Sequence, residues 1–267
     1  MAVRVEKKGP VTTVIHSRPE VRNAMDPESA EALEAAFLAF DADPEASVAV
    51  FYGEGGAFCA GWDLSFAASL KGETNPLAAL DFTDDESRAP RGPMGPSRLA
   101  LTKPVIAAVA GPAVAGGFEL ALWCDLRVVE ETAYFGVYCR RWGIPLIDGG
   151  TVRLPRIIGR GRALDLILTG RKVEADEALR MGLCDRVVAP GAARDAAEAL
   201  AADIARFPQT CVRADRQSVF AQEGLDEASA LRSEWAISSR VVEQEGLDGA
   251  TRFKSGKGRH GDFGDIA

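Results

Sequence analysis

The sequence is short of several residue types that particular classes of site require. It has only two histidines in 267 residues, and so few bases give a Ser-His-Asp triad little support. Its five cysteines are an odd number and include no CxxC pair, a pattern that indicates neither a disulfide framework nor a zinc site. We therefore expect reduced thiols and no bound metal.

Features of membrane and secreted proteins are also missing. No apolar run approaches the ~18 residues that a membrane-spanning helix needs. The first residues, "MAVRVEKKGPVTTV", lack the apolar stretch of a secretory signal. These observations predict a cytoplasmic protein with no membrane partner.

Positive charge is scarce as well. The chain has 31 lysines and arginines against 39 aspartates and glutamates, a formal net charge of −8, which opposes a general surface for nucleic acid. The stretches "GEGG" and "GRGRAL" lack the full strand, GxGxxG and later acid pattern of a dinucleotide site. We expect no nucleic-acid partner and no nicotinamide or flavin cofactor.

The residues that are present alternate between strand and helix patterns. Hydrophobic residues make up 47% of the chain, enough for a large core. A helix is predicted from an Asp26 cap with Pro27 at its first position, and two more within 159–170 and 174–182. Stretches rich in β-branched and apolar residues predict strands over 11–17, 47–53, 104–111 and 126–131. This order predicts an α/β fold.

The same patterns divide the chain into regions. We expect a sheet-bearing core over residues 1–190 and a C-terminal helical region over 191–267, where the pattern is almost entirely helical. Between 66 and 103 several prolines and an acidic cluster interrupt any core periodicity. We interpret that segment as a mobile cover.

Two predicted strands are followed by loops of small residues, "AFCAGWD" (57–63) and "AVAGGFE" (113–119). Small side chains let backbone N–H groups approach a ligand closely, and two such donors on one oxygen form an oxyanion hole. The second loop also opens a helix, whose unpaired amides and dipole favour negative charge. These loops predict a site that stabilises an enolate, with Glu119 beside it in an otherwise apolar helix.

Several separated motifs resemble those of the crotonase superfamily, the enoyl-CoA hydratases and isomerases. They are "RPEVRNAMD" (18–26), "GGAFCAGWDL" (55–64), "KPVIAAVAGPAVAGGFELALWCDLRV" (103–128), "GGTVRLPRIIGRGRALDLILTGR" (149–171) and "EADEALRMGLCDRVV" (174–188). The resemblance implies a crotonase-like spiral of ββα units followed by a C-terminal helical trimerisation region. It also implies a homotrimer or a hexamer formed by two trimers.

The resemblance further implies an acyl-CoA thioester as substrate, with no separate cofactor. By position, the N–H groups of Ala60 and Gly116 are the two oxyanion donors, and Glu119 is one of the two catalytic glutamates of the hydratases. The residues placed where relatives hold coenzyme A are Arg22, Ala24, Ala60, Gly61, Trp62, Asp63 and Gly116.

The second glutamate is where this chain departs from the hydratase pattern. In "FGVYCRRWGIPLIDGG" Cys139 occupies that place, and a thiol with a reference pKa of ~8.5 is a poor substitute for a carboxylate. Asp148, one residue beyond the aspartate position of isomerases, is a candidate second carboxylate. Arg140 and Arg141 are candidate ligands for an acidic acyl group, with surface or interface ion pairs as the alternative.

Three functions remain open from the sequence. The first is an enoyl-CoA hydratase with Glu119 as the main acid and base. The second is an enoyl-CoA double-bond isomerase, in which Glu119 or Asp148 moves one proton. The third is a non-catalytic homologue that binds acyl-CoA or a partner and has lost the second acid. The structural alternatives for the two residues are a helix-start acid for Glu119 and an ordinary turn or helix cap for Asp148.

Overall fold

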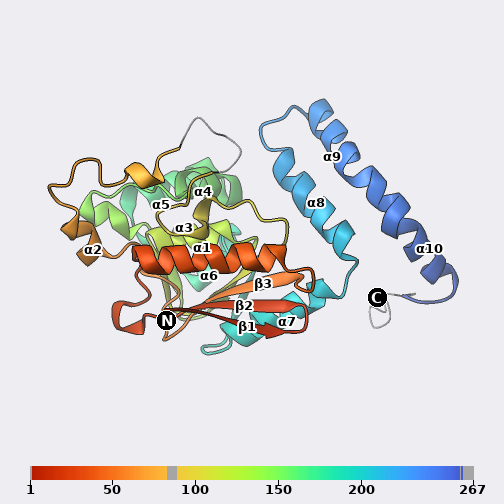
Figure 1. The fold of residues 1–267 in the computed structure, drawn as a ribbon, viewed down its shortest axis with the longest axis horizontal. Helices are drawn as coiled ribbons and strands as arrows, with labels where there is room; N and C mark the ends of the chain where they lie inside the picture. The colour runs from red at the N-terminus through yellow and green to blue at the C-terminus, as the bar shows by residue number, and fades with distance from the viewer. Residues whose placement is uncertain (1, 83–88, 259, 261–267) are drawn as a thin grey trace.

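The computed structural model describes residues 2–82, 89–258 and 260, and their strands form two sheets (Figure 1). The larger sheet has the order β1-β2-β3-β4-β6-β9, with β1 antiparallel to β2 and every other neighbouring pair parallel. Its strands are β1 (Val3–Lys8), β2 (Val11–His16), β3 (Val48–Gly53), β4 (Val105–Val109), β6 (Leu126–Glu130) and β9 (Arg186–Val188). The predicted α/β class is confirmed.

A smaller sheet has three short strands, the first of which overlaps the 113–119 loop of small residues. β5 (Pro112–Val114) is parallel to β7 (Tyr134–Gly136), which pairs antiparallel with β8 (Lys172–Glu174). The helices that follow these strands are α3 (Gly116–Trp123), α4 (Gly150–Ile158), α5 (Arg160–Thr169) and α6 (Ala175–Met181). The predicted helices in 159–170 and 174–182 are therefore confirmed.

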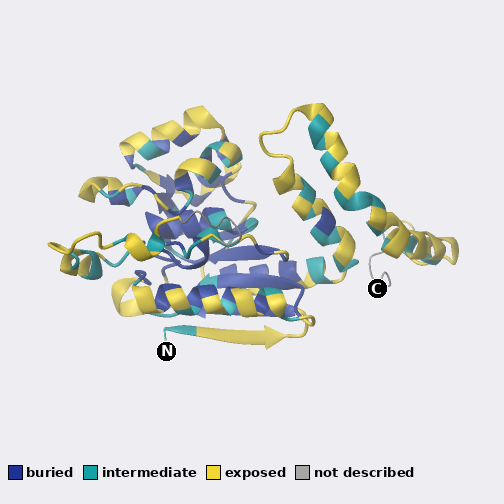
Figure 2. Ribbon diagram, turned by 45° about the horizontal axis from the view of Figure 1, so that its top comes forward, coloured by how far each residue is buried: buried dark blue, intermediate teal, exposed yellow. Residues whose placement is uncertain are grey.

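The central strands are buried on both faces (Figure 2), which explains the continuous apolar sequence of β4. Because side chains alternate across a strand, Val48 and Val50 of β3 face the core beneath α7 (Ala193–Ala205). Ala49 and Phe51 face the opposite core, beside α1 (Pro27–Ala42). This sandwich of helices on a mostly parallel sheet holds the strand ends rigidly.

The helix predicted from Asp26 is α1. Asp26 accepts a hydrogen bond from the Ser29 N–H at 2.8 Å, and Pro27 is the first helical residue, so one orphan donor of the helix start is satisfied. The strand β1 was not expected, because its residues are mostly polar and exposed at the sheet edge.

The C-terminal helices differ in how they meet the body. The helix α7 packs on the main sheet, whereas α8 (Gln209–Ala221), α9 (Glu227–Val241) and α10 (Leu247–Lys254) form an arm beside it (Figure 1). Large apolar side chains are exposed on this arm, namely Val219, Phe220, Leu231, Trp235, Leu247 and Phe253. No helix within the described residues is long and apolar enough to cross a membrane.

The segment 66–103 is only partly a surface cover. The acidic cluster within 83–88 lies outside the described residues, and α2 (Leu64–Ser69) is exposed or half-buried. Met94 and Ser97, however, are each only 1% exposed. The interpretation as a mobile cover is therefore wrong for its final part, which packs inside the protein because its polar groups find partners there.

A buried asparagine, Asn23, links its own loop to the backbone of residues 54–57, which follow β3. Asn23 adopts a left-handed φ of 56° and is fully buried. Its Oδ1 accepts from the Arg18 N–H at 2.7 Å, and its Nδ2 donates to the carbonyls of Glu54 (2.8 Å) and Ala57 (2.7 Å). An asparagine tolerates this backbone conformation better than most residues.

We expect Asn23→Ala to lower the free energy of unfolding by about 2–4 kcal/mol, because it leaves buried backbone groups unpaired. Asn75→Ala is the matched control, since Asn75 has a similar φ of 52° at an exposed position. That control should cost about 1 kcal/mol or less. Urea unfolding of both variants measures the difference, and equal losses would contradict the role of the Asn23 side chain.

Candidate active site

The two loops singled out in the sequence meet in the structure. Cys59 forms a parallel bridge with Ala113, in which the Val114 N–H donates to the Cys59 carbonyl at 3.0 Å. The contact requires glycine: a Cβ at Gly117 would lie 2.1 Å from the Cys59 carbonyl oxygen, and one at Gly61 would lie 2.8 Å from the Ala115 Cβ. The prediction that the two loops meet is therefore confirmed.

Gly116 lies in the pocket wall at the start of α3. The preceding residue, Ala115, has the unusual backbone angles φ 53° and ψ −126°, a strained conformation of the kind that persists at functional sites. Within the described chain the Gly116 N–H has no backbone acceptor, and Gly116 lines the pocket. This amide is available to a ligand.

The assignment of the other donor to Ala60 is wrong in this structure. The Ala60 N–H donates to the carbonyl of Arg22 at 3.0 Å. An amide that already has a backbone acceptor is not free to bind a substrate oxygen. Ala60 instead joins the 57–63 loop to the loop that contains Arg22.

The available amide of this loop is that of Trp62. Met25 pairs with the residues on either side: its N–H donates to the Gly61 carbonyl at 2.7 Å, and its carbonyl accepts from the Asp63 N–H at 2.8 Å. The Trp62 N–H between them has no backbone acceptor among the described residues. Trp62 and Gly116 line one pocket and are the two candidate donors.

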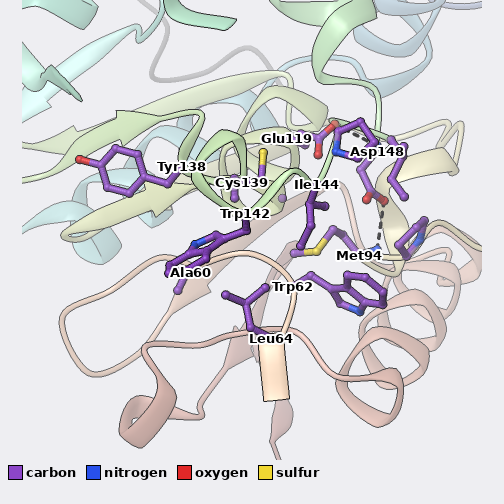
Figure 3. A pocket seen from close by; sticks show the side chains of 15 residues that line it. Ala60, Trp62, Leu64, Met94, Glu119, Tyr138, Cys139, Trp142, Ile144 and Asp148 are labelled. Atoms are coloured by element: carbon purple, nitrogen blue, oxygen red, sulfur yellow. Dashed lines mark hydrogen bonds between the residues drawn. The ribbon is translucent and has the colours of Figure 1, made fainter. Parts of the chain in front are cut away.

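The pocket is an open cavity of about 550 Å³, including the space at its mouth. Most of its wall is apolar, and Figure 3 shows the labelled side chains converging on it from separate segments. The ionisable groups in the wall are Glu119, Tyr138, Cys139 and Asp148. The remaining lining residues are Ala60, Trp62, Leu64, Pro93, Met94, Ala115, Gly116, Trp142, Ile144, Pro145 and Ile147.

Glu119 is held in the pocket by the start of α4. The residue is 3% exposed, and its Oε1 accepts from the N–H groups of Asp148 (2.9 Å) and Gly150 (2.8 Å). Burial, and then the charge of Asp148, raise the pKa of Glu119 to about 7, although the two amides act in the opposite direction. Near neutral pH this carboxyl can therefore both accept and return a proton.

Asp148 also lies in the pocket wall and is 3% exposed. Its Oδ1 accepts from the Met94 N–H at 3.0 Å and from the Ser97 hydroxyl. Burial raises the pKa of this carboxyl. The structure thus brings Asp148 next to Glu119 but turns its carboxyl toward Met94 (Figure 3).

Cys139 lies in the pocket as a thiol. Burial, followed by the charge of Glu119, raises the pKa of Cys139 above its ordinary value, so no thiolate is expected at neutral pH. The neighbouring arginines, the candidate ligands of an acidic acyl group, are not among the residues that line this pocket. Arg140 Nε donates to the Ile167 carbonyl at 3.1 Å, and the Arg141 guanidinium lies 4.1 Å from the Tyr138 ring centroid.

The other residues assigned to coenzyme A have varied surroundings. Arg22 is exposed and Ala24 is buried, and the Ala24 carbonyl accepts from Arg18 Nη1 at 2.6 Å. The Asp63 carboxylate caps α2 and lies 3.2 Å from Arg18, so this side chain already has structural partners. Gly61 lies at the contact between the loops.

Sequence reasoning missed several residues that line the pocket or, like Ser97, contact a residue of its wall. Met94 and Ser97 belong to a proline-rich stretch without periodicity, and nothing in the sequence marks them. Tyr138 and Trp142 flank the position of Cys139, and their aromatic character was the available signal. Among the described residues, no group of three His, Cys, Asp or Glu side chains is arranged to hold a metal ion.

Comparisons with known proteins agree with this architecture. The family model described as "Enoyl-CoA hydratase/isomerase" matches residues 6–258. The enoyl-CoA hydratase EchA19 of Mycobacterium tuberculosis is 37% identical over 244 residues, covering 89% of this chain and 87% of that protein. A carnitinyl-CoA dehydratase of Salmonella arizonae is 37% identical, covering 80% of this chain and 78% of its own length.

Solved structures show the same fold. An enoyl-CoA hydratase from M. tuberculosis H37Rv superposes with a TM-score of 0.85 at 33% identity, covering 95% of this chain and 96% of that one. One from Bacillus anthracis gives 0.85 at 30% identity, covering 96% of each chain. These matches confirm the crotonase-like fold with its helical C-terminal region. The chain therefore belongs to the enoyl-CoA hydratase/isomerase family of the crotonase superfamily.

Proposed function

We propose that the protein is an enoyl-CoA hydratase, which adds water to a 2-enoyl-CoA through an enolate, with Glu119 as its acid and base. The observation that carries this proposal is a buried carboxyl in the same pocket as two amides that have no backbone acceptor in the described part of the chain. The similar proteins include enoyl-CoA hydratases and a carnitinyl-CoA dehydratase, which supports a lyase that acts on CoA thioesters. No cofactor beyond the substrate is needed.

The amides stabilise the charge that develops during addition. When water attacks Cβ, the electrons of the double bond move toward the thioester oxygen, which becomes an enolate oxygen. The N–H groups of Trp62 and Gly116 donate to that oxygen. Each donor of such a hole typically contributes ~3–4 kcal/mol to the stabilisation of the transition state.

Glu119 completes the proton balance. Its ionised carboxylate takes a proton from water as the water oxygen bonds to Cβ, and it then returns the proton to Cα. A pKa near 7 suits both steps. Because Cys139 stands where hydratases carry a second glutamate, a single carboxylate serves as both base and acid.

A second candidate function is double-bond isomerisation. The feature that favours it is the cysteine at position 139, in place of a second glutamate, which leaves Glu119 as the carboxyl available to move a proton between two carbons. The same oxyanion donors serve that reaction, since it also passes through an enolate.

We also propose where the substrate and the other subunits bind. The backbone of residues 60–63, with Arg22 and Ala24, forms the surface for the coenzyme A moiety. The exposed apolar side chains of the arm, including Leu231 and Trp235, are suited to bury against other copies of the chain in a trimer or hexamer. We place the protein in the cytoplasm.

Incubation with a 2-enoyl-CoA in heavy water distinguishes these activities. Hydration predicts a 3-hydroxyacyl-CoA with one stable deuterium at Cα, detected by mass spectrometry, together with loss of the absorbance of the conjugated thioester. Isomerisation predicts a 3-enoyl-CoA and no added oxygen. A broad panel of CoA esters that bind but give neither product would favour the non-catalytic homologue.

Glu119→Gln should lower kcat by about a thousandfold or more, since the amide cannot take a proton from water. Binding of a saturated acyl-CoA should change by less than about threefold, because Gln retains an acceptor for the amides of residues 148 and 150. Glu131→Gln, at an exposed position, is the control and should behave as wild type. Full activity of the Glu119 variant would reject its role.

The same variant should be more stable than wild type at high pH. The ordinary pKa of the Glu119 carboxyl is 4.5 and its folded pKa is about 7, so wild type loses stability as the pH rises through this window. The Gln variant has no such loss. The difference in unfolding free energy should grow by about 2 kcal/mol between about pH 5.5 and pH 8. Urea unfolding at both pH values measures it, and a constant difference would contradict the raised pKa.

A further inference from the structure

Asp148 contacts both Glu119 and the segment of residues 94–97. Its backbone N–H donates to Glu119 Oε1 at 2.9 Å, while its Oδ1 accepts from the Met94 N–H and the Ser97 hydroxyl. Arg153 of α4 reinforces this junction by donating to the carbonyls of Asp148 (2.9 Å) and Ser97 (2.7 Å). The segment around residues 94–97 is thereby fastened to the start of α4.

The fastened segment packs directly against the oxyanion loop. A Cβ at Gly116 would lie 2.5 Å from the Met94 Sδ and 2.8 Å from its Cγ, so the Met94 side chain fills the space beside Gly116. Met94 is 1% exposed, and both residues line the pocket. Any shift of the Met94 backbone would open this contact and admit water beside the Gly116 amide.

We propose that Asp148 is a positioning residue, whose carboxylate holds Met94 against Gly116 and so keeps the Gly116 N–H directed at the thioester oxygen. It does not transfer a proton to the substrate. Two donors already occupy its Oδ1, and its carboxyl points toward Met94 (Figure 3). This inference rests on the proposed function, because it assigns a role within the same oxyanion site.

The charge of Asp148 has a second, separable effect. It is the largest contribution after burial among those that raise the pKa of Glu119. Removing that charge while keeping the hydrogen bonds should therefore lower the pKa of Glu119. In a plot of kcat/KM against pH, the acidic limb would then move to lower pH. A purely structural residue would not cause this change.

Kinetics of two Asp148 variants test the positioning role. Asp148→Asn keeps an acceptor oxygen for Met94 and Ser97 but cannot act as an acid or base, so it should retain at least about a third of kcat. Asp148→Ala should lose about 10- to 100-fold in kcat with KM changed less than about threefold. The exposed Asp176→Ala is the control. Equal losses in the Asn and Ala variants, or none in the Ala variant, would overturn the proposal.

A spectroscopic measurement separates this proposal from the proposed function. Butyryl-CoA labelled with ¹³C at its carbonyl has no double bond to hydrate, and an oxyanion hole lowers its C=O stretching frequency on binding. The shift should persist in Asp148→Asn and fall by at least about half in Ser97→Ala and Met94→Ala. Because Ser97→Ala and Met94→Ala leave Asp148 in place, they test its positioning role even if Asp148→Ala fails to fold.

The outcomes are distinguishable. If wild type binds butyryl-CoA without any carbonyl shift, the oxyanion site of the proposed function is wrong. If wild type shows the shift and Ser97→Ala and Met94→Ala retain it in full, the oxyanion site stands and the positioning role of Asp148 is wrong.

Discussion

The chemistry of this pocket depends on the backbone pairing between two loops that follow neighbouring strands. The bridge between Cys59 and Ala113 places the Trp62 and Gly116 amides in the wall of one cavity. The loops emerge from β3 and β4, which are paired in the core of the main sheet. Because the proposed donors are main-chain groups, the fold sets their positions, and the Met94 side chain packs beside one of them, Gly116.

Burial raises the pKa of Glu119, the proposed acid and base, and also limits the stability of the protein. Glu119 is removed from water at a cost that its two amide donors offset only in part, since its pKa stays well above the ordinary value. Such a conflict between local stability and function is common at active sites. Here the strain of Ala115 adds to it. The surrounding core, with its aromatic cluster of Phe37, Phe51 and Phe58, compensates.

How much of the fold was predictable depended on how strongly each element was buried. The strands β2, β3, β4 and β6 are mostly buried and rich in β-branched and apolar residues, so their signal was strong and each was expected within a residue or two of its observed bounds. The edge strand β1 is polar, and β5, β7 and β8 have three residues each. Such strands are held by pairing with distant segments, which a local pattern does not record.

By itself the sequence determined the α/β class, the family resemblance and the positions of Gly116 and Glu119, because these follow from local patterns of glycine, apolar residues and charge. The tertiary structure alone decided that Ala60 is hydrogen-bonded while Trp62 is available, since the deciding partners, Arg22 and Met25, come from another loop. It also decided the surroundings of Asp148. Hydrogen bonds between residues far apart in the chain depend on how the chain folds back on itself, and no local pattern encodes that.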